Sequence, residues 1–109
     1  MPSMAEILHN DGYKNFAESI STNDGKAKFK KRWEELVIKN YQFYNINGEF
    51  NKDLSAALQR VSILIVYDEI WDGRDEWWWK PFKKIAKPYI TVLLYTELVK
   101  LQKRGILIF

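Results

Sequence analysis

The sequence predicts one mainly α-helical domain, a bundle of three to five helices over residues 1–109. Its 109 residues match the usual size of a single domain, and neither an internal repeat nor a long linker divides them. Apolar side chains recur at spacings of three and four through the longer segments, which is the helical period. A hydrophobic share of 47% with 28% charged residues is typical of a globular protein.

The first 25 residues predict two short helices and a loop. Helical candidates at residues 4–10 and 13–20 are separated by Asp11 and Gly12, a pair that favours a turn. Residues 21–25 consist of Ser, Thr, Asn, Asp and Gly in that order, and this run of capping and turn-forming residues indicates a loop.

The first long helix is expected over residues 26–44. Seven side chains share one of its faces, and Asn40 is the only polar one among them. The seven are Phe29, Trp33, Leu36, Val37, Asn40, Tyr41 and Tyr44. Gly48 follows and favours the left-handed backbone with which helices often end.

A second long helix, residues 54–70, is expected at the centre of the bundle. Its apolar positions recur at helical spacing after Asp53, a residue that suits a helix N-cap. These positions are Leu54, Ala57, Leu58, Val61, Leu64 and Ile65. Because Ile63 and Val66 add apolar character to other faces, we expect protein on nearly all sides of this helix. The β-branched run at residues 61–67 also suits a buried strand, but the helical spacing that leads into it favours a helix.

The last long helix is predicted from Pro81 onward, after Gly73 ends the central one, because proline suits the first helical turn. An apolar stripe runs through it and consists of Phe82, Ile85, Tyr89, Val92, Leu93, Thr96 and Val99. Pro88 lies inside the segment and predicts a kink or a later start. Gly105 favours the end of the helix, and the apolar residues 106–109 are compatible with a short terminal strand.

Tryptophan is concentrated in one stretch, because four of the five lie between residues 71 and 79. Consecutive side chains diverge along a helix or a strand, so three adjacent indoles cannot all face one core, and at least one should lie at a surface. Trp is also enriched among binding hot spots, and an apolar chain end needs a surface to pack on. The predicted interface, through which the protein would form a homodimer, comprises Trp77, Trp78, Trp79, Ile106, Leu107, Ile108 and Phe109. For the indoles, the alternatives are sealing of the core, base stacking or a membrane-interface position. For the tail, the alternative is folding back onto the core.

Two basic clusters suggest nucleic-acid binding as an alternative function. The chain carries a net charge of +3, and its cations gather in two segments that flank an acidic one. The cluster residues are Lys26, Lys28, Lys30, Lys31, Arg32, Lys80, Lys83, Lys84 and Lys87. Cations at the start of a helix, together with its free N–H groups, attract phosphate. The simpler interpretation is a solvated polar face.

The acidic segment holds Asp68, Asp72 and Asp75, which a continuous helix would place on one face. Oxygen-ligand metals bind such clusters. Gly73 interrupts the helix, however, and the spacing does not match a calcium-binding loop. An acidic surface in contact with a basic one, its own or a partner's, is favoured, and neither a metal nor a cofactor is predicted.

Signatures of enzymes are missing from the sequence. The chain has no cysteine and a single histidine, His9, and it shows no glycine-rich phosphate loop, nucleophile elbow or paired-histidine zinc motif. No signal-peptide pattern appears, and the longest apolar stretch is too short for a bilayer, so a soluble cytoplasmic protein is expected. Abundant Ile, Lys and Asn suggest an AT-rich viral or mobile-element genome. The sequence therefore predicts a non-enzymatic, self-associating protein-interaction module.

Overall fold

The computed structural model describes residues 3–47 and 52–105, and every regular element in these ranges is an α-helix. The helices are α1 (Met4–Leu8), α2 (Asp11–Ser19), α3 (Asn23–Asn47), α4 (Lys52–Asp72) and α5 (Lys80–Lys103). The predicted all-α class is confirmed. The suggested strand at residues 106–109 lies outside the described residues.

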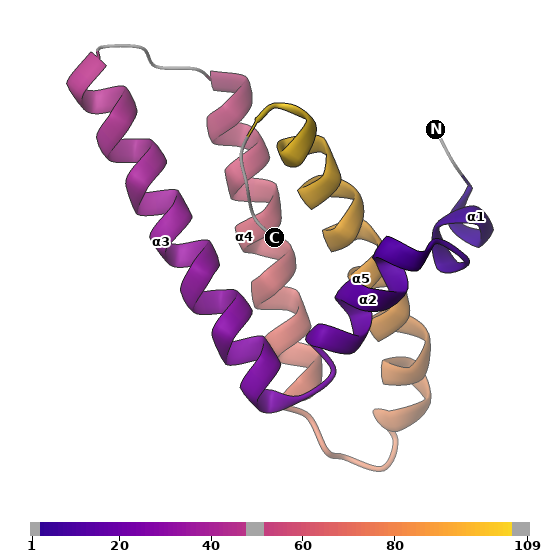
Figure 1. Ribbon diagram of the computed structural model, residues 1–109. Helices are drawn as coiled ribbons and strands as arrows, with labels where there is room; N and C mark the ends of the chain where they lie inside the picture. Colours follow the sequence, from indigo (N-terminus) through magenta and orange to yellow (C-terminus); the bar gives the residue numbers. More distant parts are fainter. Residues whose placement is uncertain (1–2, 48–51, 106–109) are drawn as a thin grey trace.

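Helix α4 occupies the centre of the bundle, with α3 on one side and α5 on the other (Figure 1). The short helices α1 and α2 cross in front of α5 in that view. Tyr13 and Phe16 of α2 pack against Tyr95 of α5. The centroid of the Tyr95 ring lies 5.7 Å from that of Tyr13 and 5.9 Å from that of Phe16. The Asn10 side chain joins the two elements, because its Oδ1 accepts hydrogen bonds from Tyr13 N and from the Tyr95 hydroxyl.

The core forms where α4 meets its neighbours, as the sequence predicts. Val61 of α4 and Leu98 and Leu101 of α5 have no exposed surface. Trp33 of α3 is buried against the same cluster and donates a hydrogen bond from Nε1 to Ser62 Oγ at 3.1 Å. Residues 61–67 are helical, so the rival interpretation as a strand is wrong.

The predicted turn at Asp11 and Gly12 is wrong, because Asn10 caps α2 and both residues belong to that helix. The start of α3 also departs from expectation. The helix begins at Asn23, inside the predicted loop, because Thr22 Oγ1 accepts a hydrogen bond from Gly25 N and so caps the first turn. Gly25 is required there, since a Cβ on it would lie 1.8 Å from the carbonyl oxygen of Ser19. Helix α4 begins at Lys52, one residue before the predicted cap. Helix α5 continues through Pro88, which excludes a later start.

The apolar stripe predicted for the last helix is mostly not the buried one. Phe82, Ile85, Tyr89 and Leu93 are all exposed. The side of α5 that faces the core carries a second stripe, which consists of Ile90, Leu94, Leu98 and Leu101. Lys83 and Lys87 precede this second stripe on the same side of the helix. Because both are charged, the sequence pattern does not show this side as apolar.

The expectation that the central helix is surrounded by protein is also wrong. Ile63 and Val66 are each 52% exposed, and Tyr67 and Ile70 on the same side are about as accessible. The reason is geometric: α3 and α5 flank α4, and the side of α4 turned away from the core has no described helix over it. The sequence therefore supplies α4 with more apolar surface than the described helices cover.

Candidate interaction surface

The exposed apolar residues of α4 and α5 form two stripes. On α4 they are Ile63, Val66, Tyr67 and Ile70, and on α5 they are Phe82, Ile85, Tyr89 and Leu93. Within each helix they are spaced three or four residues apart, which places them on one side of it. We call these eight residues the outer apolar face.

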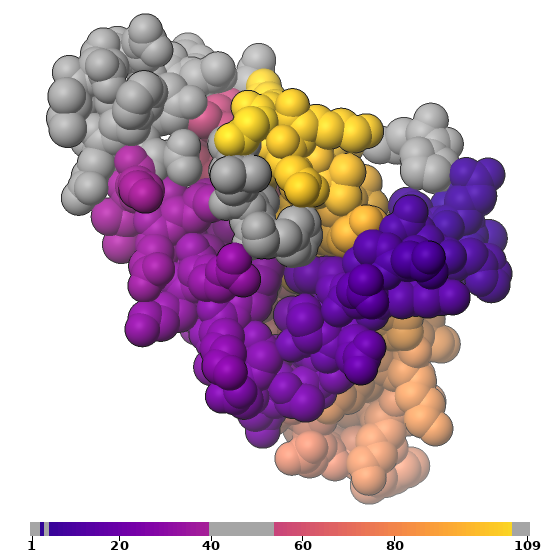
Figure 2. Space-filling view, viewed as in Figure 1, coloured from indigo at the N-terminus to yellow at the C-terminus, as the bar shows by residue number. Residues whose placement is uncertain are grey.

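Both stripes lie on the same side of the molecule. Contacts from Lys87 to Asp68 and from Arg60 to Glu97 hold α4 and α5 side by side, and each stripe lies opposite the buried residues of its helix. In Figure 1 the side of α4 and α5 farthest from the viewer has no described helix over it. Figure 2 shows the near side, where α1 and α2 cover α5. The outer apolar face is therefore continuous across two neighbouring helices.

The centre of the outer apolar face is uncharged. The lysines in the first turns of α5 do not border it, because Lys80 and Lys84 share the side of the helix on which Lys87 points toward Asp68. Depletion of charge and enrichment in aromatic side chains distinguish the centres of protein interfaces from the rest of a protein surface.

The three adjacent tryptophans in the connection between α4 and α5 differ in exposure. Trp77 is 83% exposed and Trp78 45%, so the prediction that at least one indole lies at a surface is confirmed. Trp79 instead stacks on Trp71, with ring centroids 4.4 Å apart, and the Arg74 guanidinium lies 4.6 Å from its ring. Two of the three adjacent indoles are thus accessible in the connection between α4 and α5, whereas the third packs against the last turn of α4.

The exposed indoles predict a specific fluorescence result. In a dilute sample, a neutral quencher should remove a red-shifted part of the emission, because Trp77 is largely open to solvent. The Trp77→Phe variant should lose most of that part, whereas Trp33→Phe, which removes a buried indole, should retain it. Equal quenching of the two variants would contradict the exposure of Trp77.

The acidic segment contacts the chain's own basic residues. Asp68, which is only 7% exposed, accepts from Lys87 Nζ at 2.5 Å and lies 3.4 Å from Lys26 Nζ. Asp72 lies 2.8 Å from Lys87 Nζ and also contacts Lys26, while Lys83 Nζ lies 4.0 Å away. We call these five residues the ionic cluster. It joins α3, α4 and α5 next to residues 73–79, the connection between α4 and α5, which we call the tryptophan loop.

The position of Lys26 within the ionic cluster predicts a pH dependence of stability. Burial and the neighbouring Lys87 cation lower the pKa of Lys26 below 10.5, and the attraction of Asp68 opposes them. The unfolded chain therefore holds this proton to a higher pH than the folded one, so the free energy of unfolding should rise as the pH rises from the lowered pKa toward 10.5. Denaturant unfolding across alkaline pH should show this contribution in the natural protein and lose it in Lys26→Met.

The predicted basic clusters are partly neutralised within the molecule. Besides the lysines of the ionic cluster, Lys28 pairs with Asp24 at 3.0 Å and Lys30 with Glu69 at 2.9 Å. The remaining members, Lys31, Arg32, Lys80 and Lys84, are exposed. Members of the two clusters meet only where the carboxylates of Asp68 and Asp72 lie between them, among the ion pairs of the described residues. Among the residues searched, no three His, Cys, Asp or Glu side chains are placed to hold a metal ion.

The sequence predicted that at least one of the three adjacent indoles is exposed, but it did not predict most of the outer apolar face. The sequence did contain a signal for this face, because the central helix is apolar on more than one side. The tail at residues 106–109, which the predicted interface included, lies outside the described residues.

Comparisons of the chain with protein-family models, with curated proteins and with solved structures found no match. None of the described helices could cross a bilayer, given their lengths and apolar content.

Proposed function

We propose that this protein is a non-enzymatic interaction module that self-associates through the outer apolar face, together with Trp77 and Trp78. The observation that carries the proposal is the exposure of two apolar stripes on adjacent helices, where Phe82 is 57% and Ile85 76% accessible. Scattered apolar residues on a surface are ordinary, but a continuous face of aromatic and branched side chains marks a binding site.

The size of the face fits a second copy of the chain. A fully accessible large side chain exposes about 200 Å². At their fractional exposures, the eight residues of the face and the two indoles together expose on the order of 1,000 Å². A typical monomer leaves a largest apolar patch of roughly 300–600 Å², and a stable interface covers about 800 Å² on each partner. The face is thus larger than a monomer usually leaves open and sufficient for one partner of a stable dimer.

The shape of the face also suits a twofold arrangement. Helices α4 and α5 form an antiparallel pair, and two such pairs packed face to face make a four-helix bundle. In a twofold dimer each apolar stripe meets the same surface of the partner, so a neutral, self-complementary face needs no second kind of partner. The neutral centre favours protein over an anionic lipid surface or nucleic acid, whose recognition requires cations.

The mass in solution tests the proposal. Light scattering coupled to gel filtration should give twice the chain mass of 13.0 kDa at micromolar concentration and approach 13.0 kDa on dilution. High salt should leave the association in place, because burial of apolar surface drives it. A mass of 13.0 kDa at the highest concentration would overturn the proposal. A monomer that gains mass only on addition of DNA, with steep loss at raised salt, would favour the alternative of nucleic-acid binding and also overturn it.

A further inference from the structure

A basic pocket lies between α4 and α5, near the C-terminal end of α5. Its volume is about 350 Å³. Four cationic side chains, Arg60, Lys100, Lys103 and Arg104, line it together with a single carboxylate, Glu97. This end of the helix pair is opposite the tryptophan loop, and none of these cations belongs to the two clusters predicted from the sequence.

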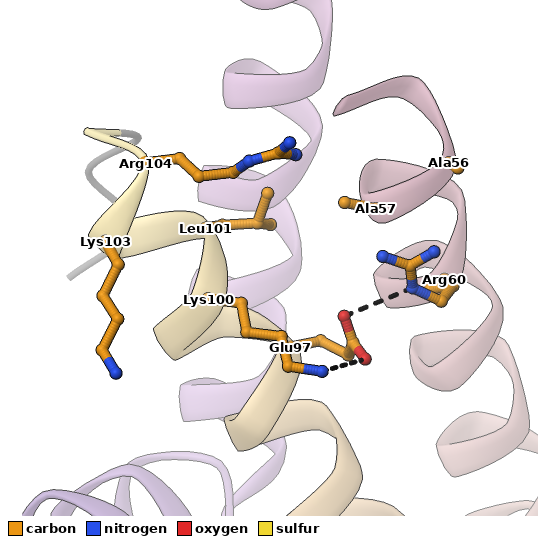
Figure 3. A pocket seen from close by; sticks show the side chains of 8 residues that line it. All are labelled: Ala56, Ala57, Arg60, Glu97, Lys100, Leu101, Lys103 and Arg104. Carbon is orange, nitrogen blue, oxygen red and sulfur yellow. Dashed lines mark hydrogen bonds and ion pairs between the residues drawn. The ribbon is translucent and has the colours of Figure 1, made fainter. Parts of the chain in front are cut away.

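The charges inside the pocket do not balance. Glu97 Oε2 lies 3.3 Å from Arg60 Nε, and its Oε1 lies 3.5 Å from Lys100 Nζ (Figure 3). One carboxylate therefore contacts two of the four cations and can neutralise the charge of only one. Because the Lys103 ammonium points away from this space (Figure 3), the pocket keeps a surplus of about two positive charges, which favours a polyanionic ligand over a neutral one.

The pocket is shaped by rigid parts of the fold. Ala57 and Leu101 are buried and form its base, and the small alanine side chains leave the space open. In Figure 3 the guanidinium groups of Arg60 and Arg104 extend from opposite helices into the space between them, whereas Lys103 points away. Arg104 is the C-cap residue of α5, and Gly105 follows it with a φ of 88°.

We propose that this pocket binds a phosphate-bearing ligand with two or more linked phosphate groups. A guanidinium presents paired N–H donors that match two phosphate oxygens, and Arg60 and Arg104 place two such groups on opposite sides of one cavity. Lys100 adds a third cation beside Glu97. The linked phosphates could belong to a free nucleotide or polyphosphate, or to a nucleic-acid backbone, because the chemistry of recognition is the same.

Calorimetry with inorganic pyrophosphate tests the site directly. The Arg60→Gln and Arg104→Gln variants should each weaken binding at least about tenfold, because each removes a charged, bidentate donor. Lys84→Gln removes the same charge from an exposed position near the other end of α5 and should change affinity by less than about twofold. Glu97→Gln should strengthen binding, because it removes the carboxylate that competes for the same cations.

The direction of the Glu97→Gln effect distinguishes a ligand site from a structural ion pair, since mere loss of structure would weaken binding in every variant. No heat with millimolar pyrophosphate, or equal losses in the Arg60, Arg104 and Lys84 variants, would overturn the proposal. Parallel titrations with a nucleoside triphosphate and a short single-stranded oligonucleotide identify the source of the phosphates. Pyrophosphate binding should persist in the Leu93→Asp variant, because the pocket does not depend on self-association, so the two proposals fail separately.

Discussion

Replacing Leu93 with aspartate should convert the self-associated protein into monomers. Leu93 lies in the outer apolar face, is 37% exposed in the single chain and does not belong to the buried core cluster. At an apolar interface the new carboxylate would be buried without a cation, and a twofold dimer would bury two of them. We expect the dissociation constant to rise at least about a hundredfold, which corresponds to roughly 3 kcal/mol.

The structure supplies a matched control for this substitution. Leu8 of α1 is 38% exposed, nearly the same as Leu93, but it lies on the side of the molecule that carries α1 and α2. Leu8→Asp should therefore keep the mass of the dimer under conditions where Leu93→Asp gives 13.0 kDa. Circular dichroism of both variants verifies that each remains helical. Loss of the dimer in both, or in neither, would contradict the assignment of the outer apolar face.

The number and order of the helices follow from local sequence. Spacings of three and four define α3, α4 and α5, and the glycines and Pro81 mark several of their ends. These signals act over one or two turns, so they do not depend on the rest of the fold. The choice of buried face does depend on it. Helix α5 has two apolar sides, and only packing against α2 and α4 buries the one that contains Leu94 and Leu98.

The candidate surface could be predicted only in part for the same reason. Divergence of adjacent side chains requires one exposed indole, but it does not say which of the three is exposed. Stacking on Trp71 selects Trp79 for the inner position, and that contact joins the end of α4 to the start of α5. Likewise, the sequence indicated an acidic surface that meets a basic one, but pairing Asp68 with Lys26 and Lys87 required three helices to converge.

The second large effect is expected from Lys87, the central cation of the ionic cluster. Its ammonium contacts both Asp68 and Asp72, its side chain is 20% exposed, and that of Asp68 is 10% exposed. Lys87→Met should lower the free energy of unfolding by about 3 kcal/mol or more, because it leaves the almost fully buried Asp68 with Lys26, which it shares with Asp72. Urea unfolding followed by circular dichroism, at a protein concentration low enough to keep the chain monomeric, measures the change.

Two further variants separate the role of burial from that of charge. Lys28→Met removes the same charge from an ion pair whose side chains are 75% and 79% exposed, so it should cost less than about 1 kcal/mol. In the double variant Asp68→Leu with Lys87→Met, both buried charges are replaced by apolar groups, and most of the lost stability should return. If the double variant were as unstable as the sum of its single changes, the stabilising role of the cluster would lie in packing rather than in the pairing of charges. The recovery is therefore the decisive measurement, because the double variant removes the buried carboxylate together with its cation and leaves no unpaired charge between them.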